Sequence, residues 1–422
     1  MKKVYAFIAA FFYCIVCAVA QSSFFDNYVF QQWSSLGGLT GATANDIIQT
    51  KDGFINIGTY EGLIRFDGVA FTTLKRAKDN EYTFHSVRVV MQDSSENIWV
   101  GSNEDGLQLL SKNDENVTFT TENGLPNNSV RAIVEDKKGN VWVGTAAGVV
   151  YLTKSKHLLN PQFEAGSVPE GVVTKELFCD TAGRIWLVTE NEKGLFVFQD
   201  GLFRTIASLD SLGSYGTSAI GQDLQGNFWI GLRSGGLVKI ENEQAIRIKT
   251  GTLLDKVDTH AIYTNKDGTM WFGTGSGIVV FNNGVFSEYK NKALVDVKVT
   301  KIISDREGNV WIATDNNGVG KLTHGRFKMT KTNCAANAIA EDSEGRIWIG
   351  TDKGVLCYKN DVAETNDLTE YTKGVRVRHV EIAGNGDILV SCYARLGQLR
   401  YYVNGEKKRF DRQLDNKGWS CG

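Results

Sequence analysis

One short pattern is written nine times along this chain of 422 residues, and it constrains the fold more than any other feature. The pattern is D-x-x-G-x-φ-W-φ-G-T, in which φ is an apolar residue, and its third copy runs from Asp136 to Thr145. Asn56 fills the tryptophan position in the first copy, and Leu389 fills it in the last. The other copies carry tryptophan there: Trp99, Trp142, Trp186, Trp229, Trp271, Trp311 and Trp348.

Successive copies are 37 to 44 residues apart, and each reads as a series of short strands. In the third copy these are residues 130–134, 141–144 and 149–152. A repeat of this length with strand-like content is typical of propeller blades, whereas helical repeats of similar length need amphipathic helices. We therefore predict an all-β fold, a β-propeller built from four-stranded antiparallel blades. The 45 glycines and three prolines suit its many tight turns.

The repeated residues suggest structural roles. Asp136 is expected to accept backbone hydrogen bonds within its turn, and Gly139 to adopt a positive φ. The repeated tryptophan is expected to face the neighbouring blade, where it would bury about 150–250 Å². Because seven copies share one position, we interpret these tryptophans as core residues rather than as sugar-stacking platforms.

The number of copies suggests how the chain is divided. If seven blades close a ring, residues 21–330 form one propeller, and residues 331–422 begin a second propeller that is incomplete. A single ring of eight or nine blades is the alternative.

The first twenty residues read as a secretory signal peptide. Lys2 and Lys3 precede an apolar run, and residues 18–20 form an Ala-Val-Ala cleavage site. An uncleaved anchor is the alternative. We expect an exported, periplasmic protein.

Cysteine, histidine and charge usage exclude several classes of site. The five cysteines after residue 20 are widely spaced, so no disulfide framework is predicted, although a Cys334–Cys357 bond is left open. The histidines are scattered without ligand spacing, so we expect no metal site and no cofactor. The 46 basic and 48 acidic residues give a net charge of −2, which argues against nucleic acid as a partner.

The repeats resemble those of the two-component regulator propeller family, found in the periplasmic sensor regions of bacterial receptors. The resemblance is carried by residues 28–33, 45–49, 65–68 and 124–130. It implies a sensor that feeds a phosphorelay or a cyclase, with a membrane span and a histidine kinase or diguanylate cyclase domain beyond residue 422. The departures from the family pattern are Asn56 for tryptophan, Glu96 for the turn glycine and Asn265 for the turn acid.

The second turn of each copy varies in residue and length, whereas the first turn is mostly Asp-x-x-Gly. A scaffold places recognition where turns keep their geometry but change their side chains. Neutral drift on a solvent surface is the alternative. In this turn Tyr60 could stack on a ligand, and Arg233 suits a carboxylate or a uronate. The candidate ligand-binding residues are Tyr60, Glu61, Glu104, Glu190, Arg233, Asp315 and Asp352.

We predict an exported ligand-sensing propeller that binds a small molecule or an oligosaccharide and forms a homodimer through its propellers. A protein-interaction scaffold is the first alternative, and a propeller hydrolase or lyase the second. No catalytic residue is predicted, because the G-x-S-x-G, H-E-x-x-H and P-loop motifs are missing. His85, His260 and His379 fall near inner strands and are interpreted as core or channel residues.

Overall fold

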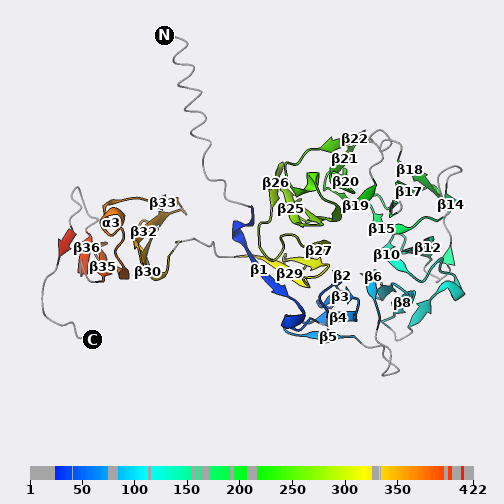
Figure 1. Ribbon diagram of the computed structural model, residues 1–422, viewed down its shortest axis with the longest axis horizontal. Helices are drawn as coiled ribbons and strands as arrows, with labels where there is room; N and C mark the ends of the chain where they lie inside the picture. The colour runs from blue at the N-terminus through cyan, green and yellow to red at the C-terminus, as the bar shows by residue number, and fades with distance from the viewer. Residues whose placement is uncertain are drawn as a thin grey trace, which may run out of the picture. The chain divides into compact units, whose positions relative to one another are not determined.

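The computed structural model describes the chain in two compact units, unit 1 (Met1–Arg326) and unit 2 (Phe327–Gly422), which we treat separately (Figure 1). The described residues are 24–39, 41–74, 84–112, 116–153, 158–159, 162–163, 171–190, 194–206, 216–242, 244–325, 332, 334–360, 362–393, 398–401 and 410–412. The predicted signal peptide and Cys421 lie outside them. Among the described residues, no helix is long and apolar enough to cross a membrane.

Nearly all regular structure is antiparallel sheet, so the predicted all-β propeller fold is confirmed. Unit 1 contains seven sheets among its described residues. The first four are β2 (Ala44–Gln49), β3 (Ile55–Thr59), β4 (Gly62–Phe66) and β5 (Phe71–Thr73); β6 (Val87–Gln92), β7 (Ile98–Ser102), β8 (Leu107–Leu110) and β9 (Val117–Phe119); β10 (Val130–Glu135), β11 (Val141–Thr145), β12 (Gly148–Leu152) and β13 (Leu158–Leu159); and β15 (Thr174–Cys179), β16 (Ile185–Thr189), β17 (Leu195–Gln199) and β18 (Leu202–Thr205), with β14 (Gln162–Phe163) added parallel to β18.

The remaining three sheets of unit 1 follow the same order. They are β19 (Thr217–Gln222), β20 (Phe228–Leu232), β21 (Leu237–Glu241) and β22 (Gln244–Ile248); β23 (Thr259–Thr264), β24 (Met270–Thr274), β25 (Gly277–Asn282) and β26 (Val285–Glu288); and β27 (Val299–Ser304), β28 (Val310–Thr314) and β29 (Val319–His324) with β1 (Tyr28–Trp33). Short 3-10 turns are η1 (Phe24–Asn27), η2 (Ser35–Gly37), η3 (Thr121–Asn123) and η4 (Leu253–Asp255).

The second strand of a sheet is the most buried, because neighbouring sheets cover both of its faces. All five residues are buried in β3, β11, β16, β20, β24 and β28. In β11 the repeated glycine is needed for this packing, since a Cβ on Gly144 would overlap the side chain of Thr174 on the next inner strand. The following Thr145 donates from Oγ1 to the carbonyl oxygen of Gly148 at 2.9 Å and so fixes the second turn.

The repeated acid and tryptophan are joined by a hydrogen bond. In the third copy, Asp136 Oδ1 accepts from the backbone N–H groups of Lys138 and Asn140 at 2.8 and 2.9 Å, and Gly139 has φ 80°. Oδ2 of Asp136 also accepts from Trp142 Nε1 at 3.0 Å. Equivalent bonds of 2.8 to 2.9 Å join Asp93 to Trp99, Asp180 to Trp186, Asp223 to Trp229, Asp305 to Trp311 and Asp342 to Trp348. All seven repeated tryptophans are buried.

Two copies of unit 1 depart from this arrangement, as does the last copy, which has Leu389 in place of tryptophan. In the sixth copy Asn265 replaces the acid, and the buried Nε1 of Trp271 has no partner among the described residues. Phe24, Phe25 and Tyr28 pack edge-on around that indole. In the first copy Asn56 donates from Nδ2 to Thr50 Oγ1 at 2.9 Å, so a polar pair replaces the acid and the tryptophan.

The N-terminal strand completes the seventh sheet. β1 pairs antiparallel with β29 from Tyr28–His324 to Trp33–Val319, and the rings of Trp33 and Trp311 stack 5.4 Å apart. Bonds also link the seventh sheet to the first: Thr300 donates to the carbonyl oxygen of Ala44 at 2.6 Å. These contacts support a ring of seven blades around a common centre (Figure 1).

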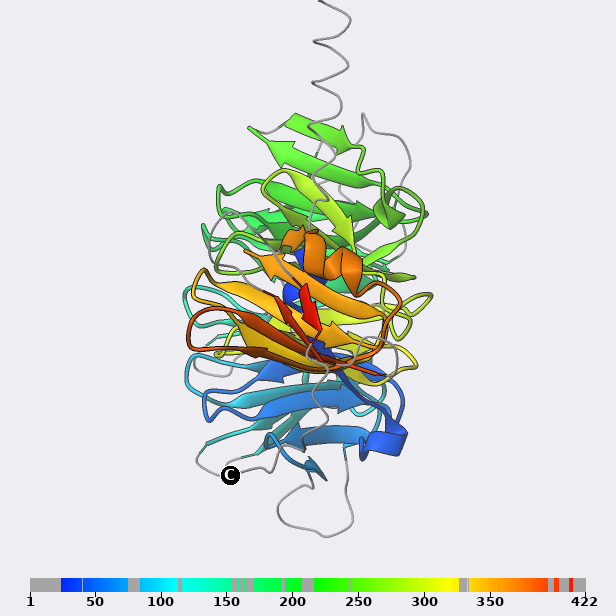
Figure 2. The same ribbon diagram turned by 90° about the vertical axis from the view of Figure 1, so that its left-hand side faces the viewer.

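Unit 2 repeats the blade pattern twice within its described residues (Figure 2). Asn337 donates across the two sheets to the carbonyl oxygen of Val377 at 2.8 Å, and Cys334 and Cys357 are free thiols. Its elements are β30 (Ala336–Glu341), β31 (Arg346–Thr351), β32 (Gly354–Lys359) and β33 (Val362–Glu364); α3 (Asp367–Tyr371); and β34 (Val377–Ile382), β35 (Ile388–Cys392), β36 (Gln398–Tyr401) and β37 (Phe410–Arg412).

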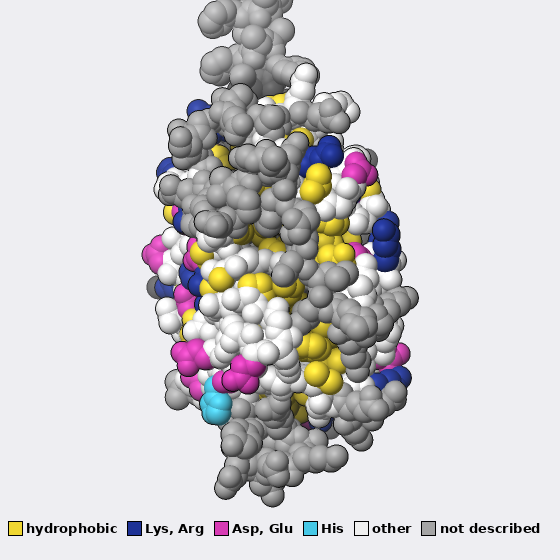
Figure 3. All heavy atoms as spheres, turned by 90° about the vertical axis from the view of Figure 1, so that its right-hand side faces the viewer, with side chains coloured by type: hydrophobic (Ala, Val, Ile, Leu, Met, Phe, Trp, Pro, Cys, Tyr) yellow, Lys and Arg dark blue, Asp and Glu magenta, His cyan; other side chains and the backbone are white. Residues whose placement is uncertain are grey.

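Acidic and basic side chains are scattered over the described part of the face shown in Figure 3. The described side chains of this face therefore form no large basic surface, in keeping with the net charge of −2.

The unpaired indole of Trp271 provides a stability test. We expect Asn265→Asp to raise the free energy of unfolding by about 1 kcal/mol, because a carboxylate would accept the buried N–H. The reverse exchange, Asp136→Asn, should lower it by about 1–2 kcal/mol, since it weakens an existing bond to Trp142. Urea unfolding of both variants measures the effect. A loss of stability in Asn265→Asp would contradict the role assigned to the acid.

Candidate functional site

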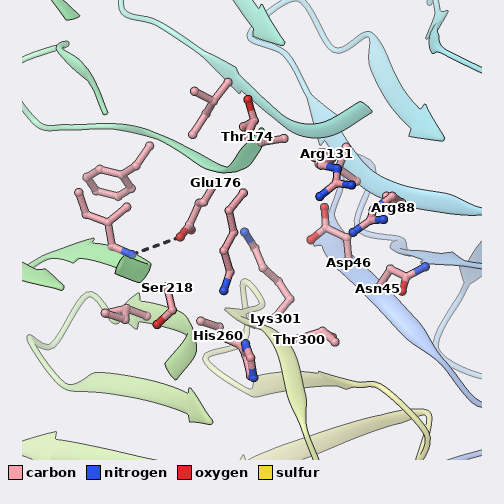
Figure 4. Close-up of a pocket in the computed structure, with 18 of the residues that line it drawn as sticks. Asn45, Asp46, Arg88, Arg131, Thr174, Glu176, Ser218, His260, Thr300 and Lys301 are labelled. Carbon is pink, nitrogen blue, oxygen red and sulfur yellow. Dashed lines mark hydrogen bonds between the residues drawn. The ribbon is translucent and has the colours of Figure 1, made fainter. Parts of the chain in front are cut away.

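A cavity of about 760 Å³ occupies the centre of unit 1. The inner strands β2, β6, β10, β15, β19, β23 and β27 supply most of its lining (Figure 4). Residues from second turns complete its mouth, among them Tyr60 and Arg233.

Every inner strand carries a bulge near its start, and this irregularity places one side chain per blade at the cavity. In β10, for example, the pairing register shifts between Val130 and Ala132, which leaves Arg131 as the extra residue. The bulge residues of the seven blades all line the cavity: Asn45, Arg88, Arg131, Lys175, Ser218, His260 and Thr300.

Sequence reasoning missed this inner ring, apart from placing His260 near the channel. A signal was present, because each bulge residue stands eleven positions before its repeat slot, as Arg131 does before Trp142 and Lys175 before Trp186. Charged residues at this fixed offset interrupt otherwise apolar strands.

The structure brings together four of the seven candidate residues found in the second turns. Tyr60, Glu190, Arg233 and Asp315 line the cavity. Glu61 and Glu104 do not line it, since each is the second residue of its turn and follows the residue nearest the inner strand. Asp352 belongs to unit 2, where it pairs with Arg376 at 2.8 Å.

Three charged side chains form the cavity floor: Asp46, Glu176 and Lys301 (Figure 4). The two carboxylates accept backbone N–H bonds from the next blade, Asp46 from Val90 at 2.8 Å and Glu176 from Ile220 at 3.2 Å. Burial raises the pKa of both carboxyl groups, and the charge of Lys301 opposes that shift. Burial acts to lower the pKa of Lys301, but the two carboxylates together raise it.

The cavity mouth, formed by the bulge and second-turn residues, is richer in basic groups. Glu190 forms an ion pair with Arg131, and its backbone carbonyl accepts from Arg233. Lys298 pairs with Asp315 at 2.9 Å. Burial lowers the pKa of Arg131, and the nearby charge of Arg88 lowers it further.

Two further groups at the mouth have strongly lowered pKa values. Burial, with the charge of Arg233 second, lowers the pKa of Lys175 to about 8. Burial, then Lys175 and Lys298, lowers the pKa of His260 to about 4. His260 is therefore neutral at pH 7, whereas Lys175 is still mostly protonated.

Several buried polar atoms at the cavity lack a partner among the described residues. They are Ser218 Oγ, Thr174 Oγ1, Arg131 Nε and Arg233 Nε. Buried donors and hydroxyls in folded proteins are normally hydrogen-bonded to protein or to ordered water. The cavity can therefore bind a polar ligand through these atoms. Within the described part of the chain, no group of three or more His, Cys, Asp or Glu residues could hold a metal ion.

The comparisons agree with this architecture. A family model described as two component regulator propeller matches residues 124–147 and 331–353, one segment in each unit. The chain is thus a β-propeller protein, and two of its repeats are similar to the two component regulator propeller model. No curated protein matches the sequence.

Solved structures with the same fold include extracellular domains of proteins described as two-component systems. The extracellular domain of a protein described as a hybrid two-component system of B. thetaiotaomicron is 21% identical, with a TM-score of 0.67, and the match covers 90% of this chain and 54% of that one. A second such domain from that organism is 16% identical, with a TM-score of 0.57, and the match covers 92% of this chain and 54% of that one. The chain thus spans about half the length of these neighbours.

An enzyme shares the fold as well. A catalytically inactive virginiamycin B lyase from Staphylococcus aureus is 16% identical, with a TM-score of 0.56, and the match covers 70% of this chain and 99% of that one. At this identity the likeness concerns the fold alone.

The lowered pKa of His260 predicts a specific acid sensitivity. A histidine in the unfolded chain takes up its proton near pH 6.5, whereas His260 does so near pH 4 in the folded protein. The unfolded state therefore binds more protons between these values, so the free energy of unfolding falls as the pH is lowered from about 6.5 to about 4. His260→Gln should remove this part of the loss. The matched control is His379→Gln in unit 2, outside the cavity. An NMR titration that places His260 near pH 6.5 would contradict the assignment.

Proposed function

We propose that this chain is the exported ligand-sensing part of a two-component-type receptor, and that unit 1 binds a small molecule or an oligosaccharide in its central cavity. The observation that carries this proposal is the cavity itself, to which each of the seven blades contributes one bulge residue from a shared backbone position. Its volume of about 760 Å³ falls within the range of about 300–1,000 Å³ usual for ligand pockets.

Three further points support the proposal. The family of the repeats includes sensor regions of signalling receptors, and the neighbours from B. thetaiotaomicron are extracellular domains of such systems. The side chains at the mouth differ from blade to blade, while the backbone that positions them is constant. The unpartnered Ser218 Oγ and Arg233 Nε offer hydrogen bonds that a ligand could take up.

We also propose that residues 1–20 are an export signal and that the protein is delivered to the periplasm. The sequence pattern of that segment and the extracellular neighbours support them. A non-enzymatic role is also proposed, because the inner ring offers varied binding groups and no repeated acid–base pair. We further propose that the signal is passed on through a membrane span to a kinase or cyclase domain, and that two propellers pair with each other.

The experiment is a thermal-shift screen of the full chain without its first twenty residues, using neutral and acidic mono- and oligosaccharides. A ligand present at 100 times its Kd should stabilise the protein by about 2.7 kcal/mol. Arg233→Ala and Tyr60→Ala should weaken that response and leave the Tm of the free protein nearly unchanged, because Tyr60 is half exposed and Arg233 lies at the mouth.

The matched control is Lys138→Ala, in the exposed first turn of the third blade, which should bind normally. A binder that is insensitive to the Arg233 and Tyr60 variants but lost in the control would place the working site on the opposite face. Turnover of a bound sugar by the wild-type protein would favour the lyase or hydrolase alternative, and a response only to protein partners would favour the scaffold.

A further inference from the structure

The basic groups at the cavity mouth are not fully neutralised by the protein. The cavity is lined by six Lys or Arg side chains: Arg88, Arg131, Lys175, Arg233, Lys298 and Lys301. Its five acidic side chains are Asp46, Glu176, Glu190, Asp258 and Asp315. The total is nearly balanced, but the two signs are distributed unevenly.

Most of the acids already have partners. The two floor carboxylates interact with Lys301, Glu190 pairs with Arg131, and Asp315 pairs with Lys298. Asp258 accepts from the backbone N–H of Ser234 at 2.6 Å. Each lining acid therefore already has a polar or charged partner within the protein.

Three cations at the mouth form no ion pair within the described part of the chain: Arg88, Lys175 and Arg233. Arg88 donates to the neutral Asn103 at 3.1 Å, and Arg233 donates to a backbone carbonyl. Lys175 makes no hydrogen bond to described residues. Like charges raise each other's free energy when partly buried, and the charge of Arg233 lowers the pKa of Lys175, so these two groups repel one another.

We propose that the cavity mouth binds an organic anion whose carboxylate, sulfate or phosphate group lies between Lys175 and Arg233. This inference rests on the proposed function and names the ligand class of the same site. A guanidinium offers paired N–H donors to such a group, and the buried Nε of Arg233 lacks a partner in the described structure. Ser218 Oγ remains available for the neutral part of the ligand.

Lys175 makes binding dependent on pH. The charged groups around it are Arg233 and Lys298, which disfavour its protonation, and Glu176 and Asp258, which favour it, with the neutral His260 alongside. A bound anion would favour protonation and raise the pKa of Lys175 above about 8. The complex would then take up a proton, so affinity should fall by up to about tenfold per pH unit above pH 8.

The test compares D-glucuronate with D-glucose, which have similar shapes and differ in the carboxylate, by calorimetry on the full chain at constant ionic strength. We expect glucuronate to bind more tightly than glucose, and inorganic sulfate to compete with it. Lys175→Gln and Arg233→Gln should each weaken glucuronate binding about tenfold, equivalent to ~1.4 kcal/mol. Lys138→Gln removes one positive charge from the opposite face and should leave binding unchanged.

Each contrary result has a distinct meaning. Equal weakening by Lys138→Gln would show a general charge effect and overturn the proposed site. Affinity for glucuronate that is constant between pH 7 and pH 9 would overturn the role of Lys175. Absence of any glucuronate or sulfate binding would overturn the anion site as a whole. A neutral sugar that binds tightly and is lost in Tyr60→Ala would leave the sensor function standing while overturning the anionic ligand class.

Discussion

The hydrogen bond between the turn acid and the buried tryptophan connects the main parts of six of the blades. In the third blade, one oxygen of Asp136 closes the first turn and the other accepts the indole N–H of Trp142. A buried N–H without a partner costs about 1–3 kcal/mol, so this bond lowers the free-energy cost of burying the large ring. With the indole fixed, Gly144 allows the next inner strand to approach closely. That inner strand carries the bulge that presents a side chain to the cavity.

The local features of this fold could be predicted from the sequence, because they recur in every copy. The period, the strand order and the turn chemistry of Asp136 and Gly139 depend only on residues close together in the chain. Ring closure could not be predicted in the same way. β1 carries no copy of the repeat and pairs with β29 about 290 residues away, a contact that no local pattern specifies. The added strand β14 is likewise short and has no repeat signature.

The candidate site was predicted only in part, for a physical reason. Variation between second turns identified Tyr60 and Arg233, which line the mouth, but variation alone cannot tell which side of a turn a residue faces. Glu61 follows Tyr60 directly and does not line the cavity. The bulge residues were not predicted, because a bulge interrupts the alternation of buried and exposed side chains along a strand. That alternation is the pattern from which the side of the sheet that a residue occupies is inferred. Lys175 thus looked like an ordinary strand residue, although its place eleven residues before Trp186 matches that of Arg131 before Trp142.

A ring built in this way limits how a bound ligand could act on the rest of a receptor. Close-packed interiors shift as bodies rather than deform continuously, and here each buried tryptophan packs within or between neighbouring sheets. A ligand would therefore signal by favouring one arrangement of whole units over another. Reversing a 1:99 equilibrium takes about 5.5 kcal/mol of differential affinity, more than a single hydrogen bond contributes. Because Lys175 and Arg233 come from two different blades, an anion between them would draw on contacts from both at once. Relief of their mutual repulsion adds a free-energy difference that a neutral guest in the same cavity would not provide.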